Sequence, residues 1–393
     1  MALCGIIAEF NPFHNGHEYL IKSLKRGGNT VICALSGNFV QRGDAAVFSK
    51  RVRTECCLKA GADIVVEMPC CYSMSTAQNF ALCGVWQLYN MGCEKIVFGS
   101  ESGNIEKLRA AARILTSDRF ARLAAEKMKS GITFAAAREL AAGECGADTE
   151  IFKNPNDNLG VEYMVAALNL RLNIDFECIN RQGVLHDSTA ANGIFASATH
   201  IRELLKCGDY ESAKKYIPPY LHEYIKAENI ADLQRTDRAI IALLRTRPEP
   251  DFKNLPDISE GIENRLYSAV RETANFEELC SAVKTKRYTL ARVRRLVLSA
   301  AIGFDRSFFM KVPPYTRVLG ASAGGISQLK KTVSLNPVVV KAADIEKLDG
   351  DCKHLFESEC RATDFYALAY SHPRACGDEY KQKFIKTEEH SND

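Results

Sequence analysis

The chain has 393 residues, of which 46% are hydrophobic and 25% are charged. These proportions are typical of a globular protein with a packed core, and they exclude collagen-like and intrinsically disordered chains. The formal net charge of +3 is too small to indicate a nucleic-acid-binding protein by itself, so local clusters of basic residues have to carry that inference.

Short apolar segments alternate with helical patterns through the first two hundred residues. We expect strands at 3–8, 30–35, 63–67, 95–98 and 175–179, and helices at 18–26, 50–60 and 76–91. This alternation predicts an α/β fold in which a parallel sheet is covered by helices on both faces. Ligands of such sheets bind beyond the carboxyl ends of the strands.

The rest of the chain has a different pattern. Residues 105–170 are predicted to be a mostly helical insertion, which the turn sequence NPNDNLG interrupts at 154–160. Beyond residue 208, charged amphipathic helices dominate and strand patterns nearly vanish. The length suits two or three domains, and we place a boundary near Gly208, between a domain at 1–208 and a mainly helical domain at 209–393. The polar tail KTEEHSND at 386–393 is expected to be disordered.

The fifteen cysteines occur as the adjacent pairs Cys56-Cys57 and Cys70-Cys71 and as single residues, with no CxxC spacing. Their odd number and the lack of a basic signal-peptide region favour reduced thiols in a cytoplasmic protein. A zinc site is poorly supported because no compact Cys/His spacing exists. No stretch approaches the roughly 20 apolar residues of a membrane span.

Two histidines lie where the first strand should turn into the first helix, in the stretch NPFHNGHEYL at 11–20. A helix N-terminus at the end of a parallel strand offers unpaired N–H groups and the positive end of the helix dipole, which favour an anion. Gly16 lets the backbone approach a ligand closely. His14 and His17 supply donors that can stabilise charge on a transferring phosphorus. No GxxxxGK[ST] or GxGxxG stretch accompanies the turn, so the phosphates would be bound without a Walker lysine.

A second motif, SATHIRELL, begins at Ser197. Ser197 or Thr199 can cap the helix, while Arg202 one turn later can reach phosphate oxygens. HNGH and SATHIR together resemble the HxGH and [IF]-S-S-[ST]-x-[IV]-R signatures of the nucleotidyltransferase superfamily. Ala198 stands where serine is commoner, so one hydroxyl contact is absent.

Six segments between residues 5 and 320 resemble, in order, the bacterial tRNA(Met) cytidine acetate ligase family: GIIAEFNPFHNGH, SGNFVQRGDAAVFSK, FGSESG, NPNDNLGVEY, SATHIREL and PPYTRVLG. The resemblance implies a Rossmann-like HxGH nucleotidyltransferase domain with a parallel sheet, followed by a mainly helical RNA-binding domain. It also implies an enzyme that activates acetate with ATP as acetyl-adenylate and then acetylates N4 of the wobble cytidine of elongator tRNA(Met). Mg²⁺ is expected to accompany ATP, and no tightly bound metal is expected.

The candidate site residues follow from these motifs and from the resemblance. Catalytic roles are expected for His14, His17 and Arg202. Contacts with ATP are expected at Ile7, Phe13, His14, Asn15, Gly16, His17, Leu20, Gly99, Asn156, Arg181, Ser197, Thr199 and Arg202. A loop that binds an anion, with acetate as a candidate, is expected at Arg42, Gly43 and Lys50; a solvated turn is the alternative.

RNA contact is expected at the basic run KTKRYTLARVRR, residues 284–295, in which no acidic residue offsets the cations. The residues concerned are Lys284, Lys286, Arg287, Tyr288, Arg292, Arg294 and Arg295, with Arg317 as an extension of the same surface. Such a run suits phosphate contacts and base stacking, although a solvated helix face is the usual meaning of charge runs.

Two other functions fit the motifs less well. A metabolite adenylyltransferase of cofactor biosynthesis would share the HxGH site, but it needs no RNA domain, and about 185 residues follow Gly208. A non-catalytic tRNA-binding protein with a degenerate nucleotide pocket would not be expected to keep both HNGH and SATHIR.

Overall fold

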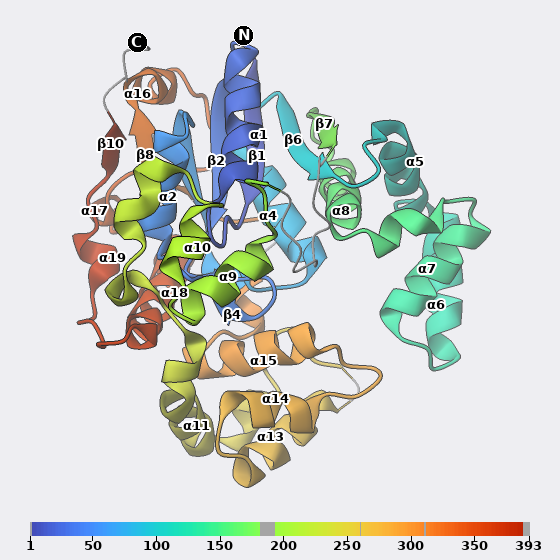
Figure 1. The fold of residues 1–393 in the computed structure, drawn as a ribbon. Coiled ribbons are helices and arrows are strands. Elements are labelled where there is room, and N and C mark those ends of the chain that lie inside the picture. Colours follow the sequence, from blue (N-terminus) through green and yellow to red (C-terminus); the bar gives the residue numbers. More distant parts are fainter. Residues whose placement is uncertain (1, 181–192, 260, 310–311, 388–393) are drawn as a thin grey trace.

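The computed structural model describes residues 2–180, 193–259, 261–309 and 312–387. Its centre is a sheet with the strand order β10-β8-β5-β2-β1-β6-β7, in which β9 also pairs with β8 (Figure 1). The strands of this sheet are β1 Leu3–Ala8, β2 Thr30–Ser36, β5 Ile64–Met68, β6 Lys95–Ser100, β7 Asp175–Asn180, β8 Thr316–Ser322, β9 Val338–Val339 and β10 Ile385–Thr387. A separate hairpin pairs β3 Phe39–Val40 with β4 Asp44–Ala45. The predicted α/β fold and the five predicted strands are confirmed.

Helices pack on both faces of the sheet and also extend beyond its edges. They are α1 Asn15–Arg26, α2 Lys50–Lys59, α3 Cys70–Ser73, α4 Ala77–Asn90, α5 Ile105–Leu115, α6 Asp118–Lys129, α7 Phe134–Glu144, α8 Pro155–Leu170, α9 Ala198–Lys206 and α10 Tyr210–Lys214 in the first part of the chain. The later ones are α11 Asp237–Thr246, α12 Glu249–Phe252, α13 Ile262–Glu272, α14 Phe276–Val283, α15 Leu290–Ile302, α16 Ala323–Leu329, α17 Ala342–Ile345, α18 Gly350–Tyr366 and α19 Asp378–Lys381. Short 3₁₀ turns are η1 Thr149–Lys153, η2 Pro219–Tyr224, η3 Ala227–Asn229, η4 Leu233–Thr236, η5 Arg306–Phe308 and η6 Ala367–Ala369. None of the helices in the described ranges has the length and apolarity needed to cross a membrane.

Alternation along the central strands divides the core in two. On β2, Val31, Cys33 and Leu35 pack with α1 and α2, whereas Ile32 and Ala34 belong to the cluster that contains α4 and α8. Because successive side chains of a strand point to opposite faces, one apolar strand supplies both clusters. Parallel pairing of β1 with β2, from Leu3↔Thr30 to Ala8↔Leu35, brings their carboxyl ends to one edge.

Two helical predictions need adjustment. The insertion expected at 105–170 forms α5 to α8, and Figure 1 shows α5, α6 and α7 beside the β6–β7 side of the sheet. However, NPNDNLG does not interrupt it: α8 begins at Pro155 with Asn154 as its N-cap. Proline suits the first helical position because its missing N–H would have no partner there.

The C-terminal half returns to the sheet, which the sequence patterns did not indicate. β8 pairs antiparallel with β5, and β10 pairs parallel with β8. The predicted boundary near Gly208 therefore separates two sequence patterns but not two sheets. Lys386 and Thr387, expected in a disordered tail, belong to β10, and 388–393 lie outside the described residues. Helices α11 to α15 lie beyond the carboxyl edge of β1 and β2 (Figure 1).

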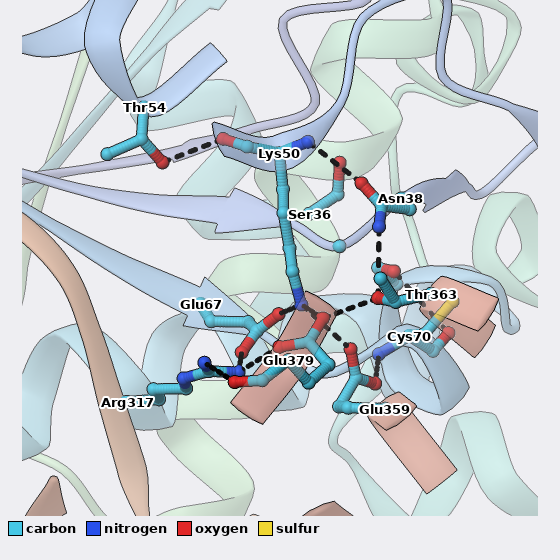
Figure 2. A network of polar contacts seen from close by, with 12 residues as sticks. Ser36, Asn38, Lys50, Thr54, Glu67, Cys70, Arg317, Glu359, Thr363 and Glu379 are labelled. Atoms are coloured by element: carbon cyan, nitrogen blue, oxygen red, sulfur yellow. Dashed lines mark hydrogen bonds and ion pairs between the residues drawn. The ribbon is translucent and has the colours of Figure 1, made fainter. Parts of the chain in front are cut away.

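A buried ionic cluster joins this half to the sheet (Figure 2). Lys50 of α2 forms ion pairs with Glu67 of β5, Glu359 of α18 and Glu379 of α19, and its side chain is completely buried. Arg317 of β8 pairs with Glu67 and Glu379. A buried charge is tolerated only when it is paired and hydrogen-bonded, so this cluster fixes how α18 and α19 sit on the sheet.

Candidate active site

The HNGH turn connects β1 to α1 in the middle of the sheet. His14 is the N-cap of α1, and its Nδ1 accepts a hydrogen bond of 3.1 Å from the N–H of Gly16. Since Nδ1 accepts, the neutral ring carries its proton on Nε2. A Cβ at position 16 would lie 3.0 Å from Cε1 of His14. Glycine is therefore needed here so that the His14 ring can keep its position.

The two imidazoles stack on each other next to two phenylalanine rings. The His14 and His17 ring centroids are 3.6 Å apart, with 25° between the ring planes. Phe10 lies 4.4 Å and Phe13 lies 5.7 Å from the His17 ring. Phe10 has a φ of +47°, a costly conformation for a bulky residue that clusters at functional sites. The turn is thus built to hold both imidazoles as one unit.

Arg202 is brought to the same turn by α9. It donates one hydrogen bond of 2.7 Å to the Asn11 carbonyl and another of 2.9 Å to Oγ1 of Thr199. Ser197 caps α9 by accepting from the N–H of His200. The structure therefore unites both sequence motifs, HNGH and SATHIR, at the carboxyl edge of the sheet.

Asn15 and Asn11 hold the surrounding chain in place. The Asn15 side-chain amide donates to the carbonyls of Ile194 (2.8 Å) and Lys215 (3.3 Å), so this side chain fastens α1 to the segments on either side of α9. Oδ1 of Asn11 accepts from the N–H of Val47 at 2.8 Å. These amides position the turn.

The electrostatics favour a polyanionic ligand. Burial lowers the pKa of Arg202, and the neighbouring Arg42 guanidinium lowers it further, whereas Asp44 and Glu9 oppose this change. Burial raises the pKa of the Glu9 carboxyl, which accepts a hydrogen bond of 2.6 Å from the N–H of Gln41. Two guanidinium groups that repel each other would both be stabilised by the charge of a triphosphate.

A second pair of loops docks at the same edge. Gly99 is the penultimate residue of β6, and Glu101 just beyond it accepts hydrogen bonds from the Asn156 side chain (2.6 Å) and from the N–H of Asp157 (3.0 Å). FGSESG and NPNDNLG are therefore in contact, and the Asn156 amide is held by Glu101. Gly99 and Asn156 remain predicted ATP contacts.

The remaining predicted ATP contacts differ in accessibility. Ile7 packs on α4, where a Cβ added to Gly84 would lie 2.7 Å from its Cγ2, so a nucleotide contact by Ile7 would involve its main chain. Phe13 is buried, and Leu20 is partly buried against the core that includes α1. Arg181 lies outside the described residues.

Lys50 is not an anion contact. Its ammonium group is completely buried and paired with three carboxylates. Burial opposes the charge, but Glu379, Glu67 and Glu359 more than offset this and raise the pKa of Lys50.

The prediction that Arg317 contacts RNA is also wrong, because Arg317 is 4% exposed and paired with Glu67 and Glu379.

The anion-loop prediction also fails for Gly43. Its N–H donates to the Val40 carbonyl at 2.9 Å, and it has a φ of +73°. A Cβ there would lie 2.7 Å from Cβ of Arg294 and from the N of Arg295. Gly43 thus serves the close approach of the β3–β4 hairpin to α15. Arg42 is exposed beside Arg202 and remains a candidate.

Half of the cations in the basic run make contacts within the protein. Arg294 donates to the Gly43 carbonyl and pairs with Glu277 and Asp44, and Arg295 donates to the Gln41 carbonyl. Arg292 pairs with Asp257 at 3.2 Å, and Tyr288 is 6% exposed. The expectation that no acidic residue offsets these cations is wrong, as is base stacking by Tyr288. Lys284, Lys286 and Arg287 are exposed and remain predicted RNA contacts.

Sequence reasoning missed four residues that shape the site: Glu9, Phe10, Asn11 and Arg53. Arg53 is completely buried and donates to the carbonyls of Glu9 and Phe48 and to Oγ of Ser36. It therefore joins the ends of β1 and β2. In the sequence it looks like one more cation of a solvated helix face. Phe10 is marked as unusual only by its positive φ, and no sequence signal predicts this backbone conformation.

Comparisons with known proteins agree with this geometry. Residues 1–382 match the HIGH Nucleotidyl Transferase family model. A tRNA(Met) cytidine acetate ligase of Thermoanaerobacter sp. (strain X514) is 36% identical over 98% of this chain and 100% of the relative. The ligase of Thermoanaerobacter pseudethanolicus is 37% identical with the same coverage. The crystal structure of Thermotoga maritima TmcAL bound with alpha-thio ATP superposes with a TM-score of 0.89 at 30% identity, covering 98% of this chain and 100% of that chain.

The family model spans nearly the whole chain, and so do relatives well above 30% identity. HNGH and SATHIR, the two motifs that carry the resemblance, meet at one turn in the structure. On these grounds the chain belongs to the tRNA(Met) cytidine acetate ligase family of HIGH nucleotidyltransferases.

Proposed function

We propose that this protein is an ATP-dependent ligase that activates acetate as acetyl-adenylate and acetylates N4 of the wobble cytidine of elongator tRNA(Met), in the cytoplasm. The observation that carries the proposal is the HNGH turn, where the stacked His14 and His17 rings lie beside an arginine tied to the Asn11 carbonyl. A relative of the same fold is described as bound with alpha-thio ATP.

In the first step, an acetate oxygen attacks the α-phosphorus of ATP, and the bond to the bridging oxygen of pyrophosphate breaks. No protein nucleophile is needed, because the work is alignment and stabilisation of charge on the phosphoryl oxygens. His14 can donate from Nε2, since its Nδ1 is engaged by Gly16. We assign the catalytic contacts to His14, His17 and Arg202.

In the second step, the cytidine N4 amine attacks the acetyl carbonyl. The bond to the AMP oxygen breaks, AMP leaves with the electron pair, and the nitrogen loses one proton. We propose that the ATP and acetate chemistry belongs to residues 1–208 and that tRNA contacts come mainly from 209–393, with Lys284, Lys286 and Arg287 among them. Both halves contribute strands to one sheet.

We propose that Mg²⁺ arrives bound to the ATP phosphates. Among the described residues, no group of three His, Cys, Asp or Glu side chains is placed to hold a metal ion. Glu9, the carboxylate beside Arg202, is partly buried and engaged by the Gln41 N–H. When bound to ATP, Mg²⁺ would neutralise phosphate charge, and the protein contributes the imidazoles and Arg202.

Acetate-dependent exchange of pyrophosphate into ATP tests the first step without tRNA. We expect the wild type to exchange only when acetate is present, and His17→Ala to lose about 10²–10³-fold, the usual cost of removing one transition-state donor. His354→Ala is the control, since that ring stacks on Phe308 in the C-terminal half. Exchange that requires a metabolite acceptor in place of acetate would instead point to a metabolite adenylyltransferase.

A further inference from the structure

A cavity of about 330 Å³ with several charged side chains in its lining lies between the N-terminus of α2 and the 378–383 segment. Its lining includes Asn38, Ser49 and Arg51 on one side and Tyr370, Arg374 and the 378–383 segment on the other. We call it the Arg374 cavity. In Figure 1, α2, α18 and α19 lie together at this side of the sheet.

The Arg374 cavity opens at the same sheet edge as the HNGH turn. Asn38 follows β2 at its carboxyl end, and β2 runs parallel to β1. The 46–49 segment lies between the two sites: the N–H of Val47 donates to Asn11 of the turn, while the Ala46 carbonyl accepts from the Tyr366 hydroxyl of the cavity. A polymer that presents one residue at the turn could therefore contact the cavity with a neighbouring part.

The cavity has an excess of positive charge. Arg51, Arg374, Lys381 and Lys383 line it together with one acid, Asp378. Arg51 pairs with Glu55 at 3.4 Å. For Arg374, Lys381 and Lys383, no carboxylate of the described residues lies within ion-pair distance. This distinguishes them from Arg292, Arg294 and Arg295, whose charges are offset by Asp or Glu side chains. The N-terminus of α2 adds the positive end of its dipole.

Arg374 also offers a flat surface. Its guanidinium lies 3.5 Å above the Tyr370 ring, and it is held in place by hydrogen bonds to the Glu228 carbonyl (2.6 Å) and to Oδ1 of Asn229 (3.3 Å). Arg374 is exposed, whereas Tyr370 is 5% exposed. The guanidinium face turned away from Tyr370 can therefore stack on a base, as arginine planes do in single-stranded RNA recognition.

We propose that the Arg374 cavity binds one unpaired nucleotide of the tRNA substrate, with its base on Arg374 and its flanking phosphates at Lys381, Lys383 and Arg51. A volume at the lower end of the range for ligand sites, about 300–1,000 Å³, suits one nucleotide and not a duplex. The inference rests on the proposed function and locates tRNA contacts outside the basic run at 284–295.

Direct tRNA binding at several salt concentrations tests this. Lys381→Gln with Lys383→Gln should weaken binding at least tenfold and reduce the log–log salt slope by roughly 0.7 per phosphate contact removed, about 1.4 in all. The matched control is Lys330→Gln with Lys331→Gln. These exposed lysines follow α16 at the far end of β8, which runs antiparallel to β5 and so ends at the opposite sheet edge.

Arg374→Lys separates stacking from charge. The lysine keeps the cation and loses the plane, so tRNA affinity should fall several-fold with an unchanged salt slope. Wild-type affinity and slope in the lysine pair would overturn the inference, as would equal losses in the α16 control. Binding is measured without acetyl transfer. A wild type that binds tRNA but never acetylates it would therefore refute the proposed function. The proposal for the Arg374 cavity would still be tested separately, by the binding measurements.

Discussion

The buried ionic cluster contains two glutamates that should lose stability to different extents on the same isosteric substitution. Glu379 pairs with Lys50 and Arg317 and accepts from Thr363. Burial opposes its charge, but these partners lower the pKa of Glu379 from 4.5 to about 2. For Glu359, burial and the neighbouring Glu67 raise the pKa well above the usual range. The paired cations thus favour the ionised form of Glu379, whereas burial and Glu67 disfavour the ionised form of Glu359.

Glu379→Gln removes the charge that Lys50 and Arg317 face. One pH unit of pKa corresponds to about 1.4 kcal/mol, so lowering the pKa from 4.5 to about 2 corresponds to about 3 kcal/mol. That agrees with the roughly 3–5 kcal/mol lost when one partner of a buried pair is removed. Glu359→Gln removes a carboxyl group whose charge is already disfavoured by burial and by Glu67, so we expect a smaller loss than for Glu379→Gln.

Urea denaturation at pH 7, followed by circular dichroism, measures both variants. The pH dependence gives a second check. Because the folded pKa of Glu379 is lowered, its contribution is present above the unfolded value of 4.5 and is lost as the pH falls toward 2. The difference between wild type and Glu379→Gln should therefore shrink over that window. Equal losses for Glu359→Gln and Glu379→Gln, or a difference that does not change with pH, would refute this reasoning.

Three further substitutions test the site and its support. Gly16→Ala places a Cβ 3.0 Å from Cε1 of His14. Pyrophosphate exchange should therefore fall at least about tenfold, while the urea midpoint stays near that of wild type. Unchanged exchange would show that the position of the His14 ring does not matter. Arg202→Lys keeps the charge but loses the planar guanidinium that reaches the Asn11 carbonyl and Thr199. The KM for ATP in the exchange assay should therefore rise. A wild-type KM would show that Arg202 has a purely structural role. In Gly43→Ala, the new Cβ would lie 2.7 Å from atoms of α15, at a residue with a φ of +73°. The substitution should lower the free energy of unfolding by about 1–3 kcal/mol. No loss would mean that the β3–β4 hairpin and α15 can move apart freely.

Local signals in the sequence were sufficient for the five strands that the first 180 residues contribute to the central sheet and for the two motifs. The apolar segments at 3–8 and 30–35 are β1 and β2, and HNGH and SATHIR meet as the resemblance implied. Both predictions depend on residues within about ten positions of one another, where strand periodicity and helix capping act.

Charged residues were the main source of error, because their partners lie far away in the sequence. Arg317 looks like a surface cation until Glu67, 250 residues away, and Glu379, 62 residues away, are placed beside it. Arg294 similarly donates to the Gly43 carbonyl from a separation of 251 residues. A run of cations in sequence shows neither burial nor pairing, so only the fold distinguishes these arginines from Lys381 and Lys383.

The most direct test of the account is to incubate the wild-type protein with ATP, radiolabelled acetate and elongator tRNA(Met), digest the tRNA and separate the nucleosides. We predict that the label is found in N4-acetylcytidine, that it requires ATP, and that His17→Ala prevents its appearance. Label that stays in acetyl-adenylate or free acetate while the tRNA remains unlabelled would contradict the proposed function.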